Sequence, residues 1–339
     1  MKASPLKLAA VCAPAVLLAG AFYWVAGSDS NPQNDPDTYV NQLILNNGYS
    51  EGYRRNHAKG ICATGYFEPS GQAAGFSSAD MLSGERSSVI ARFSIPGGLS
   101  GADNEVGIHA LGLQLSKGGE QWRMAMLSVP VFVANKPQDF LQLLQAQMPD
   151  PQTGKPRDGA VEAYFADHPE SKNFRDFLGA NPISGSFAAS PYNSISSFKL
   201  SDAKGNTNYV RYSFTPETEF LPVPEGAGPD FLFEDIAKRL STGELRWEMK
   251  LAIAEDSDPV LDATSNWQLG RPEVFSGTLV LDQVEPEVDG KCRDVNFDPT
   301  VTPSGIEPSA DPMLAARSAA YSKSHRDRLA ETAHAGDHS

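Results

Sequence analysis

The chain is predicted to fold as an α+β domain built around an antiparallel β-sheet. Short runs rich in β-branched and aromatic residues recur along it, and the long excursions between them do not alternate regularly with helices. Strands without a regular β-α alternation favour antiparallel pairing over a parallel sheet. The 25 prolines and 29 glycines are spread along the 339 residues, which is typical of a fold rich in loops.

The chain begins with an apolar run over residues 8–27, preceded by Lys2 and Lys7. About 20 apolar residues suffice to cross a bilayer, and lysines on the leading side favour a cytoplasmic N-terminus. Because no clean Ala-x-Ala cleavage site follows, an uncleaved signal anchor (a transmembrane helix) over residues 1–30 is the favoured interpretation, with a cleaved signal peptide as the alternative. A polar linker over residues 31–37 follows. Either interpretation places the rest of the chain outside the cytoplasm, as in a bacterial periplasm.

Composition and short motifs narrow the possible functions. The formal net charge of −14 argues against sequence-wide affinity for nucleic acid. The sequence contains no C-x-x-C, H-E-x-x-H, Walker or G-x-G-x-x-G pattern, so zinc, phosphate-loop and dinucleotide sites lack support. Of the three cysteines, Cys12 lies in the apolar run. Cys62 and Cys292 either pair in an oxidising compartment or are two small buried residues, and the sequence leaves both possibilities open.

The regular elements are predicted from hydrophobic periodicity. Strand patterns cover residues 61–67, 88–95, 107–115, 121–133, 194–200, 209–214, 246–255 and 277–281. Helical patterns cover residues 37–47, 137–147, 165–178 and 231–240, and a last helix begins near residue 311. The sequence has no internal repeat, and the polar stretch 330–339 is expected to be a disordered tail.

The last helix has a strong start signal. Asp311 is a good N-cap and Pro312 suits the first helical position, and an alanine-rich run follows. Arg317 and Tyr321 are four residues apart and therefore share a face. Periodicity alone favours an ordinary terminal helix, whose tyrosine packs and whose arginine pairs with a surface acid. Small residues beside that face leave room for a large flat group; they are Ala316, Ala319 and Ala320.

Two separated motifs resemble those of the catalase family, in its short form of catalase-related peroxidases. The first is Arg54-x-x-His57-Ala58-Lys59-Gly60, and the second runs from Gly305 to Tyr321. Weaker matches lie between them in the same order, among them Arg92-Phe93-Ser94. The resemblance covers residues 38–328. It implies a catalase-like antiparallel β-barrel with surrounding helices and a buried haem, as one haem domain over residues 38–329.

For the cofactor, the resemblance implies haem b with Tyr321 as the axial iron ligand. Arg317 would compensate the charge of a tyrosinate, because a guanidinium does not lose its proton. His57 would move the peroxide proton as general acid and base, oriented by Ser94. The remaining matches are arginines at the haem propionates, a histidine near them and aromatics beside the porphyrin: Arg54, Arg92, Arg328, His325, Phe132 and Phe140.

One position departs from the family pattern. Full catalases have an asparagine three residues before the proline that Pro130 matches, and here that position is Leu127, followed by Ser128. An apolar side chain cannot donate the hydrogen bond that helps to hold peroxide over the iron. The expected activity is therefore reduction of hydrogen peroxide or organic peroxides by a small organic electron donor, with weak or no dismutation.

Other functions stay open on the sequence alone. A catalase-fold enzyme that rearranges lipid hydroperoxides without a reductant would suit a membrane anchor, and a non-catalytic haem carrier or sensor would need no turnover. Because the chain ends soon after Arg328, it lacks the C-terminal segments with which larger family members hold NADPH, so no NADPH is expected. The physiological donor and the oligomeric state do not follow from the sequence.

Overall fold

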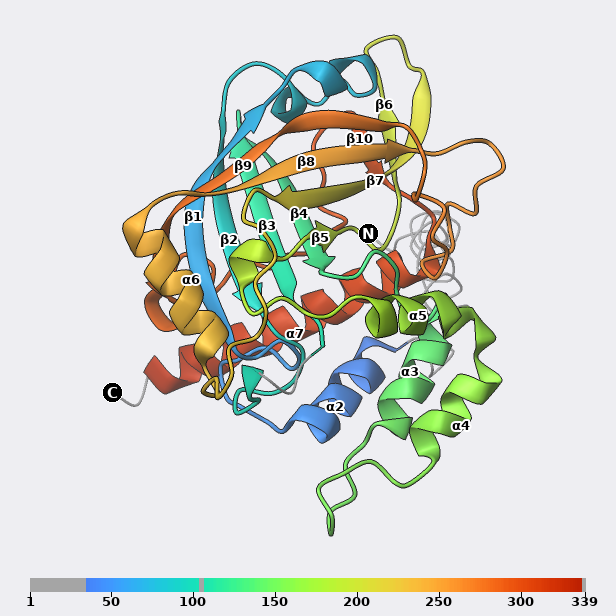
Figure 1. Ribbon diagram of the computed structural model, residues 1–339, viewed down its shortest axis with the longest axis vertical. Coiled ribbons are helices and arrows are strands. Elements are labelled where there is room, and N and C mark those ends of the chain that lie inside the picture. Colours follow the sequence, from blue (N-terminus) through green and yellow to red (C-terminus); the bar gives the residue numbers. More distant parts are fainter. Residues whose placement is uncertain (1–34, 104–106, 337–339) are drawn as a thin grey trace, which may run out of the picture.

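The computed structural model describes residues 35–103 and 107–336 (Figure 1). The predicted signal anchor and residues 31–34 of the linker lie outside the described residues. Within the described ranges, no helix is both long enough and apolar enough to cross a membrane.

Eight antiparallel strands close into a barrel, in the order β7-β5-β4-β3-β2-β1-β9-β8, and pairing of β7 with β8 completes the ring. The barrel forms the upper part of the molecule in Figure 1. Its strands are β1 Gly60–Pro69, β2 Ser87–Ser94, β3 Ala110–Lys117, β4 Glu120–Leu127, β5 Tyr192–Asn193, β7 Thr207–Pro216, β8 Leu245–Ile253 and β9 Glu273–Pro286. Two further strands, β6 Phe198–Ser201 and β10 Ile306–Pro308, extend the sheet beyond the ring. The predicted α+β class with an antiparallel barrel is therefore confirmed.

Side chains alternate between the inside of the barrel and its outer surface, as the pleat of a strand requires. On β4, Trp122, Met124 and Met126 are buried, whereas Ala125 and Leu127 lie on the other face. Large aromatic side chains fill the interior and pack ring against ring; they include Phe93, Phe187, Tyr192, Tyr212 and Trp247. The hydrophobic core is thus inside the barrel, and the outer face is available for a site.

One glycine fixes the close approach of β1 to β9. The register of the two strands shifts between Thr64 and Gly65. A Cβ atom at Gly65 would lie 2.0 Å from the carbonyl oxygen of Val280, which no side chain can tolerate. Glycine is the residue that permits such an approach of two backbones.

The helices pack outside the barrel, mostly at one end of it (Figure 1). They are α2 Pro36–Asn47, α3 Pro137–Ala146, α4 Ala160–Asp167, α5 Lys172–Ala180, α6 Phe231–Thr242 and α7 Pro312–Gly336. The long helix α7 crosses beneath the barrel and packs against α2 and α3. As predicted, it begins behind Asp311, whose Oδ1 accepts from the amide of Met313 at 2.9 Å.

Three predicted elements end early or are interrupted. The strand expected over 121–133 ends at Leu127, because Pro130 cannot donate to a ladder. The strand expected over 194–200 gives way to β5 and β6 around a serine-rich bend, where Ser194 Oγ accepts from the amide of Tyr212. The helix expected over 165–178 is two helices, α4 and α5, separated by a 3-10 turn at Pro169–Ser171.

The C-terminal stretch is ordered further than predicted. Helix α7 continues to Gly336, whereas the sequence suggested a disordered tail from residue 330. Glu331 accounts for this, because its carboxylate forms an ion pair with the buried Arg55 and accepts from the amide of Gly52 at 2.8 Å. A polar helix end is thus tied to the folded domain by a charged contact.

A disulfide joins Cys62 to Cys292, so of the two possibilities that the sequence left open the structure contains the pair. Cys62 lies on β1 and Cys292 lies in the segment that follows β9. Both residues are fully buried, and Phe297 packs with them. The covalent link therefore fastens a loop segment, residues 290–297, to the barrel wall.

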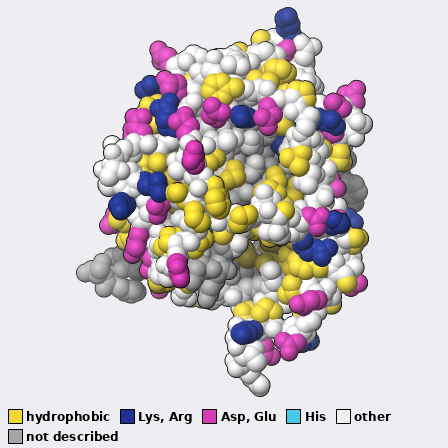
Figure 2. Space-filling view, viewed as in Figure 1, with side chains coloured by type: hydrophobic (Ala, Val, Ile, Leu, Met, Phe, Trp, Pro, Cys, Tyr) yellow, Lys and Arg dark blue, Asp and Glu magenta, His cyan; other side chains and the backbone are white. Residues whose placement is uncertain are grey.

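The charged side chains do not form a basic surface on the face in view. Figure 2 shows lysines and arginines interspersed with aspartates and glutamates, without a continuous basic patch on that face. This distribution agrees with the net charge of −14.

Candidate active site

All ten residues that the sequence singled out line one cavity between the outer face of the barrel and helix α7. They are Arg54, His57, Arg92, Ser94, Phe132, Phe140, Arg317, Tyr321, His325 and Arg328. Phe132 and Phe140 pack against each other there, with ring centroids 5.0 Å apart. Residues far apart in the sequence are thus brought to a single site.

The barrel side of the cavity is built by the register of three strands. Ser94, Ala110 and Leu127 are direct neighbours across β2, β3 and β4, and all three line the cavity. Two residues further along these strands, the next row of direct neighbours consists of Arg92, Gly112 and Ala125. Small residues at four of these six positions leave a flat wall, which suits a planar ligand.

Helix α7 supplies the opposite wall with an arginine and a tyrosine in contact. Arg317 Nη2 donates to the Tyr321 hydroxyl at 3.3 Å and to the carbonyl oxygen of Ala125 at 2.9 Å. Burial opposes the charge of Arg317, but the nearby Tyr321 oxygen raises the pKa of the guanidinium above its ordinary value. Of the three alanines that were expected to leave room beside this pair, Ala316 and Ala320 line the cavity, whereas Ala319 does not.

His57 has a constrained backbone and a neutral ring. Its φ of 55° is the only positive value at a non-glycine position among the described residues. The His57 amide donates to Asn56 Oδ1 at 3.0 Å, and its Nδ1 lies 3.3 Å from Ser94 Oγ. Burial, and then the charge of Arg92, lowers the pKa of His57 to about 3. The imidazole is therefore unprotonated at neutral pH and able to accept a proton.

Arg92 positions the His57 segment from the barrel. Its Nη2 donates to the carbonyl oxygens of His57 at 2.8 Å and of Ala58 at 3.2 Å. A Cβ atom at Gly60 would lie 2.2 Å from that same nitrogen. Arg92 is only 3% exposed and is paired with Glu287, so a side chain at position 60 would displace the guanidinium from these contacts.

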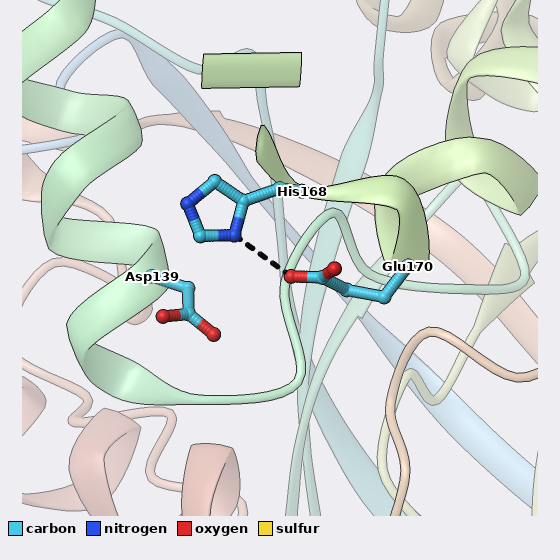
Figure 3. Close-up of side chains that lie close together, drawn as sticks. All are labelled: Asp139, His168 and Glu170. Carbon is cyan, nitrogen blue, oxygen red and sulfur yellow. Dashed lines mark hydrogen bonds and ion pairs between the residues drawn. The ribbon is translucent and has the colours of Figure 1, made fainter. Parts of the chain in front are cut away.

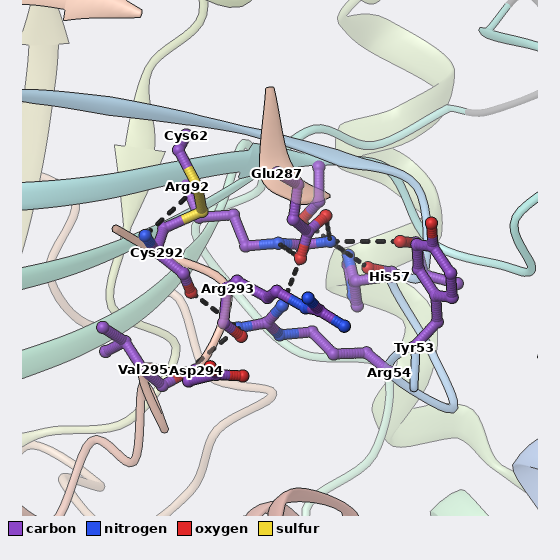
Figure 4. Close-up of polar contacts among 12 residues, drawn as sticks. Tyr53, Arg54, His57, Cys62, Arg92, Glu287, Cys292, Arg293, Asp294 and Val295 are labelled. Carbon is purple, nitrogen blue, oxygen red and sulfur yellow. Dashed lines mark hydrogen bonds and ion pairs between the residues drawn. A yellow bond between two sulfur atoms is a disulfide. The ribbon is translucent and has the colours of Figure 1, made fainter. Parts of the chain in front are cut away.

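A buried carboxylate organises the arginines at one end of the cavity (Figure 4). Glu287 forms ion pairs with both Arg54 and Arg92. Burial opposes its ionisation, but the two arginines lower the pKa of Glu287 below its ordinary value. Arg54 Nη2 also donates to a run of three carbonyl oxygens in the disulfide-linked segment, those of Cys292, Arg293 and Val295.

The free donors at this end of the cavity fit the carboxylates of a haem. Arg328 is 3% exposed and forms no ion pair with any described residue, and its buried Nε lacks an acceptor. Its Nη1 donates to the Arg293 carbonyl at 2.8 Å, and His325 Nε2 lies 2.9 Å from the Asp294 carbonyl. A buried guanidinium without a counter-ion calls for an anion, and carboxylates match its geometry.

The cavity beside the β-barrel combines a neutral histidine, an arginine-backed tyrosine, a flat wall and an arginine rim, and this lining fits a haem group. The comparisons with known proteins specify the class. The family model described as "Catalase" matches residues 51–335. The chain belongs to the catalase family, whose members bind haem and act on peroxide.

Two curated relatives bear the name catalase-related peroxidase. The one from Synechococcus elongatus is 33% identical over 299 residues, which cover 86% of this chain and 88% of that protein. The one from Mycolicibacterium paratuberculosis is 29% identical over 296 residues, or 85% and 93% of the two chains. Catalase A from Saccharomyces cerevisiae has the same fold, with a TM-score of 0.74 and 24% identity. The likeness covers 82% of this chain and 61% of that larger one.

Several residues that shape the cavity were not singled out from the sequence. Glu287 lies in a polar loop with no motif around it, and only its contacts reveal its importance. Asn56 stands inside the first motif at a variable position, yet its Oδ1 accepts from the amides of both His57 and Gly97. Tyr39, Val40 and Leu43 of α2 also line the cavity. The sequence showed only that they lie on the apolar face of a helix, not that this face belongs to a site.

The unpaired donors of Arg328 predict a specific effect on haem retention. Replacement Arg328→Gln should increase the rate of haem loss about 10-fold or more, since a hydrogen bond to a charged group contributes roughly 1.5–3 kcal/mol. The rate is measured by transfer of haem to an excess of a high-affinity haem acceptor. Arg326→Gln is the matched control, because Arg326 is exposed on the same helix and absent from the lining. Equal rates in the two variants would contradict the assignment.

Proposed function

We propose that the chain is a haem b peroxidase, which reduces hydrogen peroxide or organic peroxides with a small organic electron donor and has weak or no dismutase activity. The observation that carries this proposal is Leu127, which lines the same cavity as His57 at the end of β4. The names of the two catalase-related peroxidases support it. An absorption spectrum of the haem protein, followed by titration with hydrogen peroxide and a dye reductant, is the direct test.

Haem bound in this cavity would supply the redox-active iron, with Tyr321 as its protein ligand. The balance of the reaction is ROOH plus two electrons and two protons, giving ROH and water. The neutral His57 can accept the proton of the bound peroxide and return it to the departing oxygen, which is the task of a general acid and base. Ser94 holds the ring orientation through Nδ1.

The α7 wall compensates charge at Tyr321. Arg317 is permanently charged and donates to the Tyr321 oxygen at 3.3 Å, so an anionic oxygen there has a counter-ion in place. The second donor contact, to the Ala125 carbonyl, fixes the guanidinium against β4. Such a preorganised charge needs no rearrangement during the reaction.

The apolar character of the cavity supports organic partners. Tyr39, Val40 and Leu43 of α2 and Leu144 of α3 line it together with Leu127. Burying apolar surface favours substrates that carry hydrocarbon. An organic hydroperoxide or an aromatic donor therefore suits this cavity better than a second molecule of hydrogen peroxide, which is fully polar.

We further propose that the domain is exported and anchored by its N-terminal apolar run. The Cys62–Cys292 disulfide supports an oxidising compartment, because such bonds are rare in a reducing cytosol. In cells, the full chain should fractionate with the membrane and be digested by protease added from the periplasmic side. Recovery in the cytosol, with both thiols open to alkylation, would contradict this proposal.

Replacement of Leu127 tests the proposed reaction preference. Leu127→Asn restores a hydrogen-bond donor to the cavity and should raise dioxygen evolution from hydrogen peroxide by about 10-fold, or roughly 1.4 kcal/mol of barrier. Oxygen-electrode assays measure it, and peroxidase turnover with a dye reports the competing activity. Leu127→Val is the control, since it keeps the position apolar. Vigorous dioxygen evolution by the unmodified protein would disprove the preference for peroxidase activity.

The pKa of His57 predicts an unusual pH profile. A base must be unprotonated, and with a pKa of about 3 this form persists as the pH falls from 7 to 5, whereas an ordinary histidine near 6.5 would become protonated. The second-order rate with peroxide, followed by stopped flow, should therefore stay constant over that range. His57→Asn should lower it by about 100-fold or more.

The opposite outcomes discriminate among functions. A rate that drops about 25-fold from pH 7 to pH 5 would show that His57 titrates with the ordinary histidine pKa of about 6.5. Haem binding without peroxide turnover would favour a haem carrier or sensor. Conversion of a fatty-acid hydroperoxide to an epoxide, with no reductant consumed, would favour the rearranging enzyme.

A further inference from the structure

A second cluster of ligating side chains lies outside the haem cavity. Asp139 of α3 faces His168 and Glu170, which belong to the turn between α4 and α5 (Figure 3). Each offers one nitrogen or oxygen atom, and these atoms all lie within 4.8 Å of one another. The three residues come from two segments that are about 30 positions apart in the sequence. The fold, not a local motif, therefore creates the cluster.

The His168 ring is held with one nitrogen turned toward the carboxylates. Its Nε2 lies 3.1 Å from Gln142 Oε1, and its Nδ1 lies 2.9 Å from Glu170 Oε1. The ring stacks on Tyr164, with centroids 4.2 Å apart. When Nε2 carries the proton donated to Gln142, Nδ1 presents a lone pair, which is how outer partners orient a metal-binding histidine.

The cluster has negative charge that no cationic side chain balances. Asp139 has no hydrogen-bond or ion-pair partner for its carboxylate in the described part of the chain, and Glu170 pairs with His168 alone. No lysine or arginine within residues 35–103 and 107–336 pairs with either carboxylate. Two carboxylates this close to each other are unfavourable without a cation between them.

A neighbour of the cluster, Tyr164, has a buried hydroxyl without a partner. Tyr164 is only 6% exposed, and its hydroxyl lacks a hydrogen-bond partner. The Tyr164 ring stacks on His168, so this hydroxyl belongs to a residue in direct contact with the cluster. A buried donor without an acceptor is costly, and a ligand or its bound water would relieve it.

We propose that Asp139, His168 and Glu170 bind a divalent transition-metal ion. One imidazole nitrogen and two carboxylate oxygens form a mixed donor set that suits Zn²⁺, with a water molecule in the fourth position beside the Tyr164 hydroxyl. The ion would tie α3 to the α4–α5 turn. Asp139 directly precedes Phe140, whose ring lines the haem cavity, so the ion would fix one wall of that cavity from outside.

Equilibrium dialysis of the tag-free, haem-loaded protein against Zn²⁺ tests the site, with bound metal counted by mass spectrometry. One equivalent should bind saturably, and His168→Ala and Asp139→Asn should each weaken binding at least about 10-fold. Glu162→Gln is the matched control, because Glu162 is exposed on α4 and outside the cluster, and it should bind as the parent does. Zn²⁺ should also raise the thermal midpoint of the parent and of Glu162→Gln, and leave that of Asp139→Asn unchanged.

Two outcomes would overturn the proposal. The first is no saturable binding at Zn²⁺ concentrations up to the millimolar range. The second is one bound equivalent that both His168→Ala and Asp139→Asn retain with parental affinity, which would place the ion elsewhere. The haem spectrum of each variant shows that it is folded, and Asp139→Asn keeps the shape of its side chain, so misfolding cannot imitate a lost ligand.

Discussion

The buried guanidinium of Arg92 connects the barrel to everything that faces the cavity. From its place on β2 it donates to the carbonyl oxygens of His57 and Ala58 and forms an ion pair with Glu287. Glu287 in turn holds Arg54, which binds three carbonyl oxygens in the segment that the disulfide fastens to β1. The strand register, the conformation of the histidine and the arginine rim therefore share one charged centre. Breaking one partner of such a network leaves the others buried and uncompensated, which costs about 3–5 kcal/mol.

The same network explains how His57 can hold an unfavourable backbone. A left-handed conformation at a non-glycine residue costs roughly 1–3 kcal/mol, and it persists only where the surroundings fix it. Here the amide of His57 is fixed by Asn56 and its carbonyl by Arg92. Burial is the main cause of the lowered pKa of His57, and the charge of Arg92, which holds the segment, lowers it further. Arg92 therefore contributes both to the position of His57 and to its protonation state.

Much of this arrangement could be predicted from the sequence, but some parts of it could not. The barrel strands and helix α7 were predictable because alternation, capping and alanine content act locally. The family resemblance, through its two motifs and the weaker matches, pointed to ten residues that line one cavity. Glu287 was not predictable, since an acid in a polar loop gains its meaning only from the arginines that the fold brings to it. The same holds for Glu331, which orders the end of α7, and for Tyr164 beside the acidic cluster. The strand predicted over 121–133 and the helix predicted over 165–178 were wrong in extent, because each apolar pattern continues past a proline that interrupts the element.

The register of β4 decides which side chain faces the cavity at the position where we propose that the chain differs from full catalases. A slip of one residue would turn Leu127 away and bring Ser128, a hydrogen-bond donor, into the cavity. Pairing of Leu127 with Ala110 on β3 excludes this slip, because Ala110 lies beside Ser94 in the same cavity-facing row. Ser128 is engaged elsewhere: its Oγ accepts from the amide of His109 at 2.9 Å, and its own amide donates to the His109 carbonyl. The apolar side chain at this position is therefore a consequence of strand pairing, and a donor could be introduced there by changing Leu127 itself without disturbing the barrel.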